Sequence, residues 1–175
     1  MRGWVPATVV AVLLAVGIGT AAYFTLGRGT GGSASPTPSV DLHSKEAVMA
    51  AVRNYYDVEA EARKTGNADL IDPVTLGHTS LASQNFHVFI AQQAAANRRS
   101  IIDHNYFSDW SVTLTAAGAT ASYRWWLHGH DSDATTGQRV EADMTSTKGA
   151  YRATLVLQNV HWLLSEVQLL QDNVS

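Results

Sequence analysis

Residues 151–157 and 161–167 read YRATLVL and HWLLSEV, and these two runs decide the fold. In the first run every second residue is apolar, a period of two that is typical of a β-strand with one buried face. Asn159 and Val160 lie between the runs and are expected to form the tight turn of a β-hairpin. The two runs therefore predict an antiparallel hairpin whose last strand covers residues 161–171.

The same period of two extends upstream over the residues that follow Ser100. Alternating strands are expected at residues 110–114, 121–128 and 140–145, with turns at 117–118, 131–137 and 148–149. Strands with one apolar face, joined by short turns, predict an antiparallel sheet that is covered on one side. In this register Trp125 points to the covered side and Trp126 points away. A slip by one residue would exchange the two.

Helical periodicity precedes the strands. Apolar residues recur at three- and four-residue spacing over residues 48–62, which predicts an amphipathic helix that runs to about Lys64. Ser44 is its expected N-cap, and Gly66 is expected to end it. A second helix is expected at residues 79–99, closed by two arginines that suit its negative end. Helices followed by strands predict an α+β fold.

Two helices followed by a long antiparallel sheet that ends in this hairpin resemble the nuclear transport factor 2-like superfamily, which includes the ketosteroid isomerases. The resemblance covers about residues 41–171. It implies a cone-shaped domain in which helices pack on a curved antiparallel sheet. Such folds serve enzymes, ligand binders and interaction platforms alike, so the fold does not choose among them.

The resemblance also implies a pocket inside the cone, where isomerase-like members hold a catalytic Asp and a Tyr or acidic donor. The candidate pocket residues here are Tyr55 and Tyr56 in the first helix, Asp103 on an early strand, and Trp162 in the closing hairpin. Strand-edge carboxylates and helix-core tyrosines are ordinary at such positions, so we assign no catalytic residue.

The uncovered face of the sheet is the expected interaction face. Its candidate residues are Arg124, Trp126, His128, Arg139, Glu141 and Arg152. Tryptophan together with arginine on an open face is typical of a protein–protein interface. This composition predicts binding to an envelope protein or to a second copy of the chain.

His128 and His130 have the i, i+2 spacing that a metal site on one strand could use, with Glu141 or Asp143 as a third ligand. Histidines beside a loop are equally ordinary without a metal. The sequence has no Gly-rich phosphate loop and no G-x-S-x-G or H-E-x-x-H motif. We therefore predict no metal site and no cofactor.

Residues 5–26, VPATVVAVLLAVGIGTAAYFTL, contain no charged residue. About 20 apolar residues span the ~30 Å hydrocarbon core of a bilayer, so this run predicts a transmembrane helix. The alternative is a secretory signal cleaved after Ala22. The apolar run continues through Tyr23 and Phe24, which suit an interfacial belt, and this favours an uncleaved anchor.

The expected organisation is a short cytoplasmic end and anchor at residues 1–26, a Gly/Ser/Pro linker at 27–40, and one domain at 41–175. All acidic residues lie after residue 40, the net charge is -3, and the chain has no cysteine. This composition excludes a disulfide framework and thiolate chemistry, and it speaks against nucleic-acid binding.

The hypothesis from sequence is a single-pass cell-membrane protein, anchored in the bilayer through Val5 to Leu26, with its C-terminal domain outside the cytoplasm. An anchor, a spacer and this fold resemble virulence-associated membrane proteins of actinobacteria and assembly components of bacterial secretion and conjugation. The resemblance implies a noncatalytic interaction or assembly domain. The alternative is a binder of small apolar ligands, or an isomerase-like enzyme, that uses the cone cavity.

Overall fold

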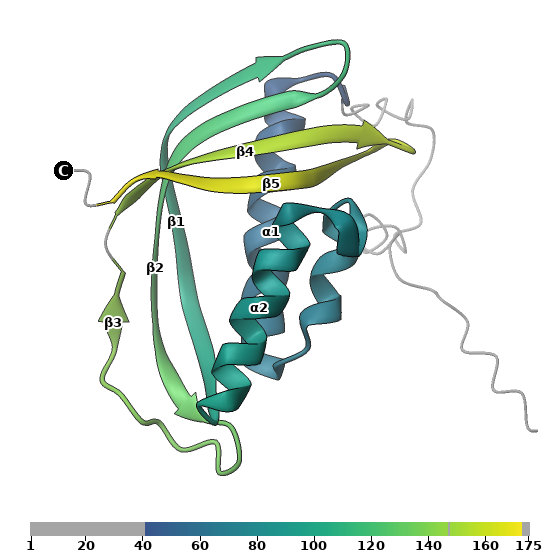
Figure 1. The fold of residues 1–175 in the computed structure, drawn as a ribbon. Helices are drawn as coiled ribbons and strands as arrows, with labels where there is room; N and C mark the ends of the chain where they lie inside the picture. Colours follow the sequence, from purple (N-terminus) through teal and green to yellow (C-terminus); the bar gives the residue numbers. More distant parts are fainter. Residues whose placement is uncertain (1–40, 147, 173–175) are drawn as a thin grey trace, which may run out of the picture. The chain divides into compact units, whose positions relative to one another are not determined.

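The computed structural model describes residues 41–146 and 148–172, in which helices precede the strands of one antiparallel sheet (Figure 1). The elements are α1 (Lys45–Thr65), η1 (Ala68–Val74), η2 (Gly77–Thr79), α2 (Leu81–Ala95), β1 (Arg98–Leu114), β2 (Ala119–Asp133), β3 (Met144–Thr145), β4 (Gly149–Gln158) and β5 (His161–Gln171). The helices pack on the inner side of the curved sheet, so the expected α+β class is confirmed.

The sheet has the order β1-β2-β4-β5. The short strand β3 also pairs with β2, beyond the part of β2 that pairs with β4. β2 changes its neighbour along its length. Residues 119–125 of β2 pair with β4, whereas His128 and Gly129 pair with β3. β1 accompanies β2 along nearly all of its length, so the two strands form one long curved ribbon (Figure 1).

The core lies between α1 and the sheet and is dominated by aromatic rings. Tyr123 is 2% exposed and Trp125 is 8% exposed, so the expected register of this strand is confirmed. The Tyr56 ring of α1 stacks on Trp125 with centroids 4.6 Å apart, and it meets Tyr123 edge-on at 6.1 Å. Offset and edge-to-face pairs of this kind add stabilisation beyond the apolar area that they bury.

The ends of α1 follow from local chemistry. The Ser44 hydroxyl accepts a hydrogen bond from the backbone N–H of Ala47, which satisfies one of the free donors of the first turn. Gly66 ends the helix at φ 71, and its N–H donates to the carbonyl of Ala62. Both expected caps of this helix are confirmed.

The expected end of the second helix is wrong. α2 stops at Ala95, Asn97 has φ 54, and Arg98 already opens β1. The guanidinium of Arg98 forms ion pairs with Asp131 and Glu141 instead of closing a helix. Partners that lie far away in the sequence, on β2 and in the segment after it, therefore override the helix-terminal preference of arginine.

The expected strand at residues 140–145 is also largely wrong, because only Met144 and Thr145 form β3. Val140, the apolar residue that suggested alternation, is 46% exposed. The Arg139 side chain donates to the carbonyl of Glu141 and contacts Asp143, which folds this segment on itself. Backbone groups held in this way are not available for a regular strand ladder.

The closing hairpin forms as expected, with β4 and β5 paired from Gln158 and His161 onward. Asn159 and Val160 both have positive φ, at 49 and 64. Positive φ at both central residues is the signature of a type I′ turn, whose twist matches that of the flanking strands. The turn is therefore tight although it contains no glycine.

None of the described helices is both long and apolar enough to cross a membrane. The run from Val5 to Leu26, to which the anchor is assigned, lies outside the described residues.

Candidate functional site

A cavity of about 250 Å³ opens between α1, α2 and the inner face of the sheet. Aromatic rings form much of its wall, among them Tyr55, Phe86 and Trp125. Two charged side chains, Glu59 and Arg63, also line it. A small, mainly apolar cavity with few polar groups is the usual form of a small-molecule site.

Glu59 and Arg63 form an ion pair along α1. Glu59 is 5% exposed, and its Oε1 accepts from Nε of Arg63 at 2.8 Å and also contacts Nη2. The guanidinium lies 4.1 Å from the centroid of the Phe89 ring. A carboxylate held so closely by a guanidinium is suited to orient a polar ligand group.

The tyrosines of this cavity are neutral hydrogen-bonding groups. Burial raises the pKa of Tyr55, and the nearby Glu59 carboxylate raises it further. Burial likewise raises the pKa of Tyr56, whose hydroxyl lies 3.0 Å from that of Tyr123. The arrangement can therefore bind a compact apolar molecule and offer it hydroxyl and carboxylate hydrogen bonds.

A second cavity of about 270 Å³ lies toward the β3 side and shares Arg63 and Phe89 with the first. Asp131 is 8% exposed in its wall, where it accepts from the Ser100 hydroxyl at 2.7 Å. Gln93 also lines it and has a buried side-chain oxygen without a hydrogen-bond partner. The two cavities therefore adjoin at Arg63 and Phe89.

The four expected pocket residues separate in the structure. Tyr55 and Tyr56 line the cone cavity. Asp103 lines a different cavity, of about 430 Å³, between α1 and β1. Trp162 is buried and donates from Nε1 to the carbonyl of Leu42 at 2.7 Å, so it ties the start of the domain to β5.

Sequence reasoning missed Glu59 and Arg63. Glu59 lies four residues after Tyr55 and three before Ala62, so it belongs to the buried stripe of α1. A carboxylate on a buried stripe with an arginine one turn later was the signal that could have found this pair.

The outer face of the sheet carries an aromatic stack. The Tyr106 and Trp126 rings, from opposed residues of β1 and β2, lie 5.4 Å apart at an interplanar angle of 13°. The Lys148 ammonium lies 4.6 Å from the Trp126 ring centroid. Trp126 is half-buried by these neighbours, whereas Tyr106 is 40% exposed.

The six residues expected on the interaction face fall into two groups. Arg124, Trp126 and His128 follow one another at alternate positions of β2, and Arg152 lies opposite Ser122 on β4. Arg124 pairs with Asp109 at 3.1 Å. Arg139 and Glu141 lie instead near the end of β2, where they contact Asp143 and Arg98.

His128 pairs with Thr145 of β3, not with Glu141, yet both histidines of β2 do meet carboxylates. His128 Nδ1 is 3.5 Å from an Asp103 oxygen, and His130 Nδ1 lies 3.9 Å from Asp103 and 3.8 Å from Asp143. Both Nδ1 atoms are buried without a hydrogen-bond partner. The Arg139 guanidinium contacts Asp143, so a metal ion here would compete with this positive charge for the carboxylate.

No protein-family model and no curated protein sequence matches this chain. Solved structures do resemble it. The intermembrane space region of the chloroplast protein ARC6 is 12% identical at a TM-score of 0.57, over 73% of this chain and 97% of that chain. Aln2 from a Streptomyces species is 12% identical at a TM-score of 0.50, over 73% of this chain and 92% of that chain.

The Kfla4162 protein from Kribbella flavida is 14% identical at a TM-score of 0.50, over 75% of this chain and 94% of that chain. At sequence identities this low, the similarity shows a shared fold and does not show a shared chemistry. Helices on the inner side of a curved antiparallel sheet are the arrangement that the resemblance implied. The described part of the chain therefore has the nuclear transport factor 2-like fold.

Proposed function

We propose that this chain is a membrane-anchored interaction domain that works outside the cytoplasm without catalytic activity. The observation that carries the proposal is the aromatic stack of Tyr106 and Trp126 on the outer face of the sheet. Tyrosine and tryptophan are enriched at the hot spots of protein interfaces, because they bury a large area at little cost in side-chain entropy. The partner is an envelope protein or a second copy of this chain.

The charges around the stack fit such a role. Lys148 covers one side of Trp126, and the ion pair of Arg124 with Asp109 lies on the neighbouring residues of β1 and β2. Charged groups around an aromatic centre are typical of an interface, where the polar rim sets specificity and the centre sets affinity.

The proposed location is supported by the apolar run at residues 5–26 and the Gly/Ser/Pro linker that follows it. The similarity to ARC6 is in line with this location, because the similar part of that chloroplast protein is its intermembrane space region. Carbonate extraction of cell membranes tests the anchor. A chain that stays in the pellet with its N-terminus intact supports it, and a soluble chain that begins after residue 22 contradicts it.

The interface is tested by placing a photo-crosslinking amino acid at Tyr106 in the full chain and irradiating intact cells. One discrete adduct is expected, and Trp126→Ala should reduce it strongly, because loss of an interface hot spot costs about 2 kcal/mol. Val88, which is 59% exposed on α2, gives the matched control position. An adduct unchanged by Trp126→Ala, with the fold intact by circular dichroism, would contradict the proposed face.

The second candidate function is the binding of a small apolar ligand in the cone. The cavity beside the buried Glu59–Arg63 pair favours it. A ligand of this kind should raise the Tm of the full chain, and Glu59→Gln should weaken the effect. Binding that is unaffected by Glu59→Gln would argue against this site.

A further inference from the structure

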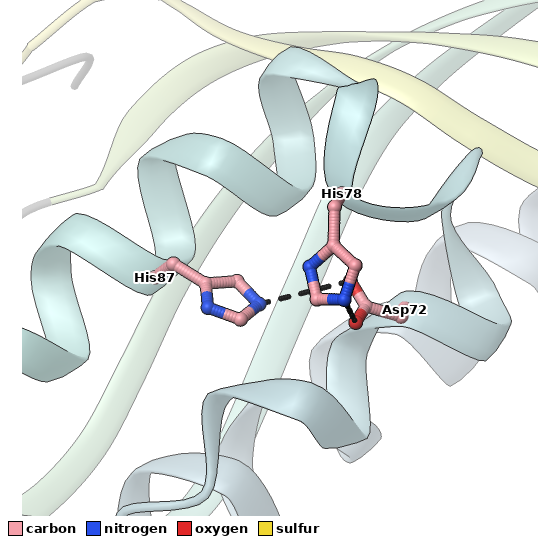
Figure 2. A group of neighbouring side chains, drawn as sticks. All are labelled: Asp72, His78 and His87. Carbon is pink, nitrogen blue, oxygen red and sulfur yellow. Dashed lines mark ion pairs between the residues drawn. The ribbon is translucent and has the colours of Figure 1, made fainter.

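Three side chains from three consecutive elements converge at one end of the helical layer, on a face that the proposed interaction does not use. Asp72 belongs to η1, His78 to η2 and His87 to α2. Figure 2 shows both imidazoles turned toward the Asp72 carboxylate. His78 Nε2 lies 3.1 Å from Asp72 Oδ2, and His87 Nε2 lies 3.7 Å from Asp72 Oδ1.

His87 Nε2 is the atom of this group that gives the strongest indication of a ligand site. It is buried and has no hydrogen-bond partner, although the side chain as a whole is 30% exposed. A separation of 3.7 Å from the carboxylate oxygen is too long for a hydrogen bond. Buried polar atoms are nearly always satisfied, so this imidazole nitrogen, which faces a carboxylate, is suited to bind an ion or a water molecule.

The spacing of the three ligand atoms suits a metal ion. Each residue offers one ligand atom, and these atoms all lie within 4.8 Å of one another. Zinc bonds of about 2.0–2.1 Å at tetrahedral angles place neighbouring ligand atoms about 3.4 Å apart. His78 Nε2 and His87 Nε2 lie 3.1 and 3.7 Å from the two different oxygens of Asp72, which are distances on either side of that value.

The carboxylate is held in place by a neighbour that is not itself a ligand. The Ser83 hydroxyl of α2 donates to Asp72 Oδ1 at 2.7 Å, and Ser83 is fully buried. Hydrogen bonds of this kind orient metal-binding carboxylates. Asp69 Oδ1 lies 4.0 Å from His87 Nε2 and adds negative charge at the same point.

We propose that Asp72, His78 and His87 bind one divalent transition-metal ion of the Zn²⁺ class. Two imidazoles and a carboxylate are ligands that such ions prefer, and three protein ligands leave a coordination position for water or Asp69. The His78 side chain is 70% exposed, so the ion reaches the site from solvent. In the cluster of His128 and His130, by contrast, Arg139 contacts the Asp143 carboxylate.

A bound ion would join η1, η2 and α2. The segment between the two short helices also pairs with the sheet, because the Leu76 N–H donates to the carbonyl of Leu164 at 3.0 Å. The ion would therefore tie the helical layer near the point where it meets β5. A ligand that binds only the folded state raises the Tm in proportion to the logarithm of its concentration.

The test is Zn²⁺ binding to the full chain, prepared in detergent without a polyhistidine tag and measured by calorimetry together with the Tm. One ion per chain is expected, with a Tm that rises with Zn²⁺ concentration. His78→Gln and His87→Gln should each weaken binding at least about tenfold, and Ser83→Ala about tenfold through the orientation of Asp72. His161→Gln, at an exposed histidine on β5, should leave binding unchanged.

Variants of the His128–His130 cluster test whether the ion binds there instead. The double variant His128→Gln/His130→Gln should still bind one Zn²⁺ with unchanged affinity. If His87→Gln fails to fold, the exposed His78→Gln carries the test, together with imidazole ¹⁵N chemical shifts in the parent chain. The proposal is overturned if the parent chain binds no Zn²⁺. It is also overturned if the double variant His78→Gln/His87→Gln binds Zn²⁺ as tightly as the parent chain does.

Discussion

The hydroxyl groups of Tyr56 and Tyr123 lie 3.0 Å apart and join α1 to β2 through a buried hydrogen bond. Because both groups are shielded from water, removal of one hydroxyl leaves the other without a partner. Tyr56→Phe should therefore lower the free energy of unfolding by about 1–3 kcal/mol, as measured by urea denaturation.

The double variant Tyr56→Phe/Tyr123→Phe is the matched control for this prediction. It removes both hydroxyls and keeps the aromatic stacking, so it should be more stable than either single variant. If the stability loss of the double variant equals the sum of the losses of the two single variants, the two hydroxyls contribute independently of each other.

The same tyrosines predict a loss of stability in alkali. Burial raises the pKa of Tyr55, Tyr56 and Tyr123 above that of a tyrosine in the unfolded chain. The folded state then keeps protons that the unfolded state releases above about pH 10, so stability is complete below this pH and falls above it. Denaturation curves recorded at a series of pH values, with tyrosinate absorbance in parallel, measure this effect.

A shallower alkaline loss is expected in Tyr56→Phe/Tyr123→Phe, because two of the groups responsible are absent. An unchanged slope in this variant would show that other groups cause the loss.

Val160 in the closing turn is strained, because a β-branched residue has φ 64 there. Left-handed backbone costs a residue with a Cβ roughly 1–2 kcal/mol, and glycine avoids this cost. Val160→Gly should raise the free energy of unfolding by about 1 kcal/mol, measured by thermal and urea denaturation.

Asn159→Gly is the control within the same turn. Asparagine tolerates the left-handed region, so this change should matter much less than Val160→Gly. Equal effects of the two substitutions would mean that loss of strain is not the cause.

The Glu59–Arg63 pair predicts an asymmetric response to mutation. Arg63→Met leaves a carboxylate that is 5% exposed without its counter-charge, which should cost about 3 kcal/mol of stability. Glu59→Gln/Arg63→Met removes both charges and should recover most of that loss. A double variant as unstable as Arg63→Met would show that packing, including the contact with Phe89, is the main contribution of Arg63.

The parts of the fold that depend on local chemistry could be predicted from the sequence. Ser44 and Gly66 mark the ends of α1 because capping involves only neighbouring backbone groups. The register of Trp125 follows from the two-residue period of a strand. The end of α2 could not be predicted in this way, since Arg98 finds its partners in Asp131 of β2 and in Glu141 of the segment after β2.

The candidate sites show the same division. Tyr55 and Tyr56 were expected at the pocket from the resemblance, and both line the cone cavity. Asp72, His78 and His87 are separated by intervals of six and nine residues, which match no single helix or strand. Only the packing of η1, η2 and α2 against one another brings their side chains together.

The change of neighbour along β2 leads us to expect parts of unequal stability in the sheet. Residues 119–125 are hydrogen-bonded on both sides, whereas His128 and Gly129 have only the two-residue β3 beyond them. Amide hydrogens in this second half should exchange with solvent through local fluctuations, while those of the first half exchange only on global unfolding. Such a fluctuation would expose the cavity beside Asp131, so water and small solutes could reach the interior while the closing hairpin stays folded.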